Sequence, residues 1–223
     1  MSRRMIVPAL FGLLGTALLL WLGFWQLERL EWKRGFLEAI EARIGAAPAA
    51  LPAAPDPTRD RFAAVRISGR IEGPEIHVLA SRKKVGPGYR VITAFVTDDG
   101  RRILLDRGFI PVSARERIRP ARPLVVVGNL HWPDETDSFT PPPDLAANIW
   151  FARNVGAMAE ALGTEPVLVI AASDTGDGIE PFPVSTEGIP NDHLNYAITW
   201  FLLAAVWLGM TGFLLWRIKR RSN

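Results

Sequence analysis

The sequence predicts a membrane protein of the α+β class, in which two transmembrane helices flank a small, mainly antiparallel β domain with one or two helices. Two apolar runs of 23 residues, Met5 to Leu27 and Leu194 to Trp216, contain no Asp, Glu, Lys, Arg or His. As a helix, each run would extend about 35 Å, which exceeds the roughly 30 Å of a bilayer's hydrocarbon core. The lipid bilayer is therefore an expected partner, and a wholly soluble protein is excluded.

The distribution of charge predicts how the two helices are oriented. The chain carries a net charge of +3 at pH 7. Six positive charges lie outside the apolar runs, at the ends of the chain: Arg3, Arg4, Arg217, Lys219, Arg220 and Arg221. Short cationic tails stay in the cytoplasm, whereas long domains cross largely regardless of their charge. We therefore expect both termini to be cytoplasmic and the central domain to be periplasmic.

The first apolar run has the features of an uncleaved anchor. It is longer than the usual apolar core of a signal peptide, and no small-residue cleavage site follows it. A mitochondrial leader rich in Ser and Arg is not visible either. The sequence thus predicts a multi-pass protein of the bacterial inner (plasma) membrane.

The segments between and around the two runs divide the chain further. We expect residues 1–27 to be the cytoplasmic N-terminus and first transmembrane helix, and residues 28–45 to extend that helix up to Gly45. Residues 46–58 contain four prolines among alanines, a composition typical of an extended linker. Residues 59–193 form the periplasmic β-rich domain. The second transmembrane helix (194–216) and a basic cytoplasmic tail (217–223) follow.

Short β-like segments separated by turn signals predict the sheet of the central domain. They are Phe62–Ile71, Glu75–Ala80, Tyr89–Thr97, Arg102–Asp106, Leu124–Leu130 and Val167–Ala172. The expected turns are Gly73-Pro74, Gly86-Pro87-Gly88 and Asp98-Asp99-Gly100, the last being the strongest hairpin signal. Between the last two strands, residues 154–162 are predicted to form a helix, with Asn154 as its cap and Gly163 as its end.

Several classes of function are excluded by what the sequence lacks. Cysteine is absent, which rules out disulfides, zinc–cysteine sites and thiol nucleophiles. The sequence contains no GxSxG, HExxH or phosphate-binding loop motif. With the basic tails set aside, the rest of the chain is net acidic, so nucleic acid is not an expected partner. Nothing in the sequence predicts an enzyme.

Histidine is scarce, and one of the three residues stands apart from the others. His77 and His131 lie in or beside predicted strands, where ordinary structural roles are expected. His193 lies at the outer end of the second apolar run, where on a helix it shares one face with Tyr196 and Trp200. The first helix leaves the membrane on the same side and places Trp25 and Arg29 there.

This group of five residues has two interpretations. An imidazole, aromatic walls and a cation are the groups that a bound haem uses for its iron, its macrocycle and its propionates. The same residue types also gather at membrane interfaces without any ligand, because Trp and Tyr are amphipathic and Arg extends toward water.

Four motifs, in order along the chain, resemble those of the Surfeit locus protein one family. They are Gly23-Phe24-Trp25-Gln26-Leu27-Glu28-Arg29 with Trp32-Lys33, then Gly86-Pro87-Gly88-Tyr89-Arg90-Val91-Ile92-Thr93, then Asp106-Arg107-Gly108-Phe109-Ile110-Pro111, and Asn191-Asp192-His193-Leu194-Asn195-Tyr196-Ala197-Ile198-Thr199-Trp200-Phe201. The resemblance covers nearly the whole chain. Two departures are Phe109, where the family more often has Trp, and Asp192, where a second Asn is common.

The resemblance implies a chaperone-like assembly factor of the respiratory chain that catalyses no reaction of its own. It would assist assembly of cytochrome c oxidase, with the large oxidase subunit and the haem a synthesis machinery as partners. It also implies that haem a is bound, with His193 as the candidate ligand of the haem iron. A scaffold that stabilises oxidase subunits without binding haem is the alternative, and an unrelated membrane-anchored binding domain is a third.

Two of the shared motifs admit a second role on the outer domain. Gly86-Pro87-Gly88-Tyr89 and Arg107-Gly108-Phe109 combine turn glycines with an aromatic residue and a cation. Such a combination suits a docking surface, and it suits ordinary hairpin construction equally well. The structural interpretation is the favoured one.

Overall fold

The computed structural model describes residues 3–83 and 85–222, which form two compact units. Residues up to Ala39 and from Thr186 onward make the first unit, a pair of helices. Residues Ile40–Ser185 make the second, the β domain. The predicted fold class is confirmed, because two apolar helices flank a mixed, mainly antiparallel sheet domain in the sequence.

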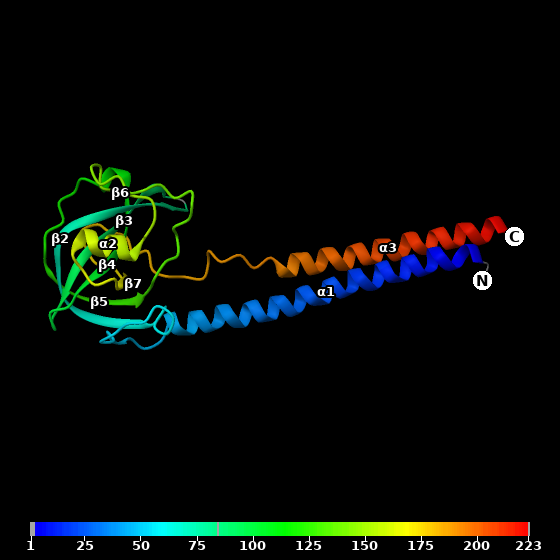
Figure 1. Cartoon of the computed structure of the whole chain (residues 1–223), viewed down its shortest axis with the longest axis horizontal. Helices are drawn as coiled ribbons and strands as arrows, with labels where there is room; N and C mark the ends of the chain where they lie inside the picture. Colours follow the sequence, from blue (N-terminus) through cyan, green and yellow to red (C-terminus); the bar gives the residue numbers. More distant parts are fainter. Residues whose placement is uncertain (1–2, 84, 223) are drawn as a thin grey trace. The chain divides into compact units, whose positions relative to one another are not determined.

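The first unit consists of α1 (Arg3–Ile44), up to Ala39, and α3 (His193–Ser222), which run antiparallel beside each other (Figure 1). Both helices are long and apolar enough to cross a membrane. Glycines let their backbones approach closely, since a Cβ on Gly15 would collide with Trp207 and one on Gly23 with Phe201. The Trp207 indole also donates a hydrogen bond of 3.1 Å to the carbonyl of Gly12.

The β domain is a closed barrel, which the sequence did not predict. Its strands are β1 (Ala49–Ala50), β2 (Ala64–Arg82), β3 (Gly86–Thr97), β4 (Arg102–Pro111), β5 (Pro123–Leu130), β6 (Ile149–Trp150) and β7 (Leu168–Ala171). The long strand β2 pairs with β3 on one side and with β5 on the other, and β4, β7 and β5 complete the ring (Figure 1). The pairs of β2 with β1 and β6, and of β4 with β7, are parallel.

Strands β3, β4 and β7 are buried on both faces, whereas β2 and β5 expose part of their outer face. All five barrel strands contribute to an interior cluster that includes Val65, Phe95, Leu105, Val126 and Val169. Part of the outer face packs against α2 (Val155–Leu162) through a second cluster that includes Ile76, Ile92, Leu104, Met158 and Leu168. Burial on both faces explains why β3, β4 and β7 are largely continuous apolar runs.

Several predicted boundaries of this domain are confirmed. Asn154 caps α2 by accepting a hydrogen bond of 3.0 Å from the Ala157 N–H, and Gly163 ends the helix in the left-handed conformation. The hairpin between β3 and β4 turns at Gly100, whose φ is +87°. Its N–H donates a hydrogen bond of 2.9 Å to the carbonyl of Thr97.

One predicted turn is wrong, and another is displaced by a few residues. Gly73-Pro74 lies within the continuous strand β2, where the pairing with β3 shifts between Glu72 and Glu75. A bulge accommodates both the positive φ of Gly73 and the missing N–H of Pro74, so the chain bends without reversing. The chain reverses between the paired residues Arg82 and Gly86, and Gly86 has a φ of +99°, so residues 86–88 begin β3 directly after the turn. A Cβ on Gly88 would meet the Ile110 carbonyl of the neighbouring strand. Close backbone approach, and not chain reversal, explains that glycine.

Candidate functional site

His193 and Gln26 form a hydrogen bond between the two helices of the first unit. His193 is the first residue of α3 and is half-buried, and its Nδ1 lies 2.8 Å from Oε1 of Gln26 on α1. The two residues are 167 positions apart in the sequence. This bond fixes the orientation of the imidazole ring at the end of the helix pair.

The partner of Nδ1 determines which ring nitrogen carries the proton. An amide oxygen can only accept a hydrogen bond, so Nδ1 is the donor and Nε2 lies outside this bond. Histidines that bind metals in proteins are commonly held in this way, with the second ring nitrogen donating to an oxygen acceptor.

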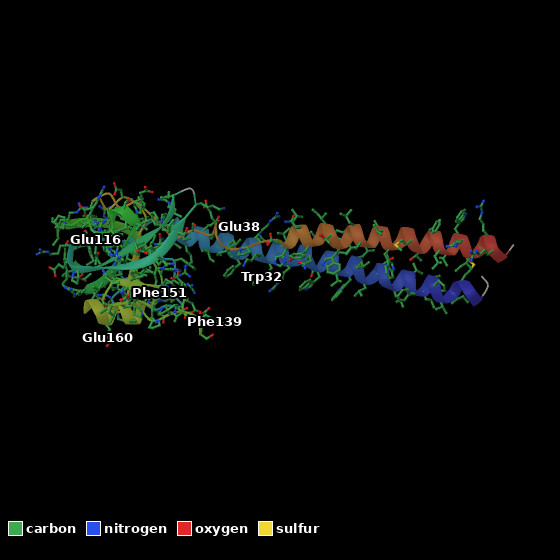
Figure 2. The ribbon with its side chains drawn as sticks, turned by 90° about the horizontal axis from the view of Figure 1, so that it is seen from above. Trp32, Glu38, Glu116, Phe139, Phe151 and Glu160 are labelled. Atoms are coloured by element: carbon green, nitrogen blue, oxygen red, sulfur yellow. The ribbon has the colours of Figure 1, made fainter. Side chains whose placement is uncertain are left out.

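The other predicted site residues lie within about two turns of Gln26 or His193 on the same two helices. Trp25 and Tyr196 are exposed, at 45% and 56%. Trp200 is half-buried, and its indole N–H has no hydrogen-bond partner within the described parts of the chain. The guanidinium of Arg29 stacks over the ring of Trp32, 4.3 Å from its centre, and Figure 2 shows Trp32 projecting from α1.

Gln26 is the functional residue that sequence reasoning missed. It stands within the first shared motif, yet only its aromatic and charged neighbours were considered as site residues. The signal that could have found it is its polarity, because a carboxamide inside an apolar run needs a partner when the run is placed in lipid.

Two apolar grooves between α1 and α3 lie elsewhere along the pair. Their volumes are about 540 and 720 Å³, and residues 7–19 of α1 and 203–217 of α3 line them. None of the predicted site residues lines either groove. Surfaces of this composition are suited to lipid chains, so they do not compete with the His193 end as a site for a polar or charged group.

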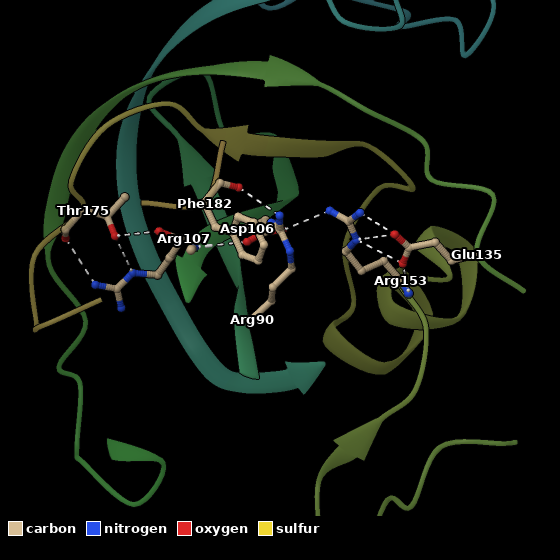
Figure 3. A network of polar contacts seen from close by, with 8 residues as sticks. Arg90, Asp106, Arg107, Glu135, Arg153, Thr175 and Phe182 are labelled. Carbon is tan, nitrogen blue, oxygen red and sulfur yellow. Dashed lines mark hydrogen bonds and ion pairs between the residues drawn. The ribbon is translucent and has the colours of Figure 1, made fainter. Parts of the chain in front are cut away.

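The motif Asp106-Arg107-Gly108-Phe109 is a buried structural element of the barrel. Arg107 and Phe109 are only 1% and 0% exposed, so the alternative that they form a docking surface is wrong. Arg107 donates to the Thr175 carbonyl at 3.2 Å (Figure 3). It also pairs with Asp177. Gly108, with a φ of +124°, forms the bulge opposite Val91 that turns Arg107 inward.

Asp106 is the centre of a second part of this network. Its carboxylate is fully buried and accepts hydrogen bonds from Arg90 at 2.5 Å and from the Gly108 N–H at 3.1 Å. Arg153 lies 3.6 Å from the same carboxylate and also binds Glu135 (Figure 3). Burial acts to raise the pKa of Glu135, but Arg153 outweighs it and holds that pKa below its ordinary value. The buried charge of Asp106 is thus balanced by the positive charges of Arg90 and Arg153.

The two remaining histidines have structural surroundings, as expected. His77 is 6% exposed, with Nε2 at 2.8 Å from the Glu75 carboxylate. His131 stacks on the ring of Phe62, with the ring centres 5.1 Å apart. Burial, reinforced by the positive charges of Arg153 and Arg61, lowers the pKa of His131 to about 4.

This lowered pKa predicts a loss of stability in mild acid. Above the ordinary histidine pKa of about 6.5 the ring is neutral in both the folded and unfolded states. Between about 6.5 and about 4 the unfolded chain binds a proton that folded His131 does not, so the free energy of unfolding falls. The expected loss is about 3 kcal/mol at most. It is measured by chemical denaturation from pH 7 to pH 4, in parallel with a His131→Phe variant.

His131→Phe keeps a ring against Phe62 and removes the titrating group, so the difference between the two unfolding curves isolates this histidine. A difference that stays constant across that range of pH would contradict the assignment. Carboxylates that titrate in the same range change the free energy of unfolding of both proteins equally, so their contributions cancel in the difference.

Fold and site together define a class: two-span membrane proteins that carry a closed β barrel between their spans and a histidine held at the end of the helix pair. The chain belongs to the SURF1 family, whose model matches residues 13–205. Surfeit locus protein 1 of Xenopus tropicalis is 28% identical over 215 residues, which cover 82% of this chain and 68% of that protein. A SURF1-like protein of Rickettsia bellii is 29% identical over 217 residues, covering 92% of this chain and 87% of the relative.

Human Surfeit locus protein 1 is similar as well, with 28% identity over 211 residues that cover 82% of this chain and 69% of the human protein. The family expected from the four motifs is therefore confirmed. Because the family match extends from residue 13 to residue 205, it includes the Gln26–His193 pair together with the whole barrel.

Proposed function

We propose that the chain assists the assembly of a haem–copper terminal oxidase, cytochrome c oxidase, by binding haem a and helping to insert it into the large catalytic subunit. The family supports the role in assembly. The observation that carries the haem-binding part is the hydrogen bond between His193 Nδ1 and Gln26 Oε1, which leaves Nε2 as a free ligand atom.

The residues at this end of the helix pair fit a haem group in their chemistry. When bound, the iron would take an imidazole as axial ligand, and basic side chains would pair with the propionates. His193 supplies the imidazole, and Arg29 is the nearby cation. Trp25 and Tyr196, both exposed, and the half-buried Trp200 supply aromatic surface for a flat apolar ring system. A single protein ligand also suits a carrier that must release its cargo.

This proposal includes a location and an orientation. In the bacterial inner membrane, both termini would be cytoplasmic, and the barrel would face the periplasm, as the charges of the tails favour. His193 would then lie at the periplasmic surface. The partners would be the large oxidase subunit and the machinery that synthesises haem a, and the chain would catalyse no reaction of its own.

A scaffold that holds oxidase subunits without binding haem is the second candidate. Large apolar side chains exposed on the β domain favour it, because such residues are typical contact points for other proteins. Ile118 and Phe139 are 95% and 90% exposed, and Phe151 is 40% exposed. Figure 2 labels Phe139 and Phe151 on this domain. The scaffold requires these surfaces and does not require a particular histidine.

The two candidates are separated by an optical spectrum of the full chain, purified in detergent from cells that synthesise haem a. Haem a bound in a fixed ratio to the protein, with the spectrum of a histidine-ligated iron, is the expected result. A folded protein that carries no haem, and that takes up none when haem a is added, would contradict haem binding and favour the scaffold.

A further inference from the structure

Polar side chains replace apolar ones at one end of the barrel interior. On β3, Thr93 lies two residues before the interior residue Phe95 and on the same face of the strand. Glu75 of β2 lies directly opposite Thr93 in the register. On β4, the buried Arg107 lies two residues after the interior residue Leu105. These side chains line a cavity of about 240 Å³ at the mouth of the barrel, together with Arg117 and Arg119 from the segment before β5.

Two buried donors in this cavity have no acceptor. The Thr93 hydroxyl and the Nε of Arg119 are both shielded from solvent and lack a hydrogen-bond partner within residues 3–83 and 85–222. Thr93 is 2% exposed, and the Arg119 side chain is 1% exposed. An unpaired buried donor is costly, and such groups in native proteins usually have a partner. Their position on one cavity indicates that the missing partner is an acceptor held between them.

The charges around the cavity favour an anion as that acceptor. Three guanidinium groups line it, those of Arg107, Arg117 and Arg119, against one carboxylate, that of Glu75. Glu75 is already engaged, since it accepts from Arg119 at 2.6 Å and lies 2.8 Å from His77 Nε2. Arg107 pairs with Asp177, so Arg117 is the guanidinium of the three that forms no ion pair with a carboxylate that lines the cavity or with Asp177.

We propose that the barrel mouth binds a small oxyanion, a carboxylate or phosphate group, through Thr93, Arg117 and Arg119. The bulge at Gly73 and Pro74 lies at this cavity, where the register of β2 against β3 shifts between the pairs Glu72–Ala94 and Glu75–Thr93. At about 240 Å³ the cavity is smaller than the roughly 300–1,000 Å³ typical of sites for larger organic ligands. The site therefore takes a small anion, and it is independent of any haem bound by the helix pair.

Titration calorimetry on the full chain in detergent tests this proposal, with inorganic phosphate and succinate as separate probes in a chloride buffer. We expect saturable binding of one or both ions. Arg117→Gln and Thr93→Val are each expected to raise the dissociation constant about tenfold or more, because each removes a donor to a charged acceptor. Arg117 is exposed and Thr93→Val is nearly isosteric, so both variants are expected to fold.

Arg66→Gln is the matched control. It removes the same charge from an exposed position on the outward side of β2, between the buried Val65 and Ile67, and should leave the dissociation constants unchanged. Binding of phosphate alone would assign the site to phosphate groups, whereas binding of both probes would include carboxylates. An absence of binding to the wild type, or an equal loss in Arg66→Gln, would overturn the proposal.

Discussion

Replacing His193 by alanine is expected to abolish haem a binding by the full chain. In the proposed site the Nε2 atom of His193 would be the ligand of the haem iron, with Nδ1 engaged by Gln26, and alanine offers no replacement. The optical spectrum of the purified variant should lose the absorption of bound, histidine-ligated haem a, while its helix content stays that of the wild type. Circular dichroism and elution volume in detergent verify the fold.

His131→Phe is the matched control, because it removes a histidine from the barrel and should leave the spectrum unchanged. Gln26→Leu provides an intermediate case. Removing the acceptor that orients a ligating histidine typically weakens binding about 10–100-fold without eliminating the ligand. Equal spectra for the wild type and His193→Ala would remove His193 as the ligand, and a Gln26→Leu variant that binds as tightly as the wild type would show that its hydrogen bond has no role.

A second large effect is expected at Asp106, where alanine should unfold or strongly destabilise the barrel. The carboxylate is fully buried, and its loss would leave Arg90 and Arg153 without their shared counter-charge. Removing one partner of a buried ion pair costs about 3–5 kcal/mol. That is a large share of the roughly 5–15 kcal/mol that stabilise a typical domain. Guanidinium denaturation followed by near-ultraviolet circular dichroism measures the change.

Asp98→Ala is the appropriate comparison, because Asp98 is an exposed carboxylate in the hairpin between β3 and β4. Its removal should change the free energy of unfolding by less than about 0.5 kcal/mol. If Asp106→Ala were as stable as Asp98→Ala, the network around Asp106 would contribute nothing to the fold. Its place in a shared motif would then need a functional explanation instead.

Local patterns predicted the elements of this fold well. The two apolar runs, the hairpin at Asp99-Gly100 and the α2 caps at Asn154 and Gly163 all depend on residues close in sequence. The closure of the barrel was not predictable in this way. Closure requires that β2 pair with β5 as well as with β3, and the local sequence of a strand does not indicate which distant strand it will pair with.

The limits at the sites have a similar physical origin. The sequence left a docking surface open as the alternative role of Arg107, because its partners Asp177 and Thr175, about 70 positions away, could not be foreseen from the residues around it. His193 was singled out by its position at the end of a helix. Its partner Gln26 was not, because nothing near either residue indicates that two positions on different helices meet.

The pairing of β2 with both β3 and β5 also has a consequence for the order in which the protein is made. Synthesis produces β2 early, yet the ring cannot close before β7, which ends at Ala171. Until then the nascent domain carries unpaired strand edges, which are prone to mispairing. Only 21 residues separate Ala171 from His193, where α3 begins, so nearly the whole chain before the second apolar helix must be made before the ring can close.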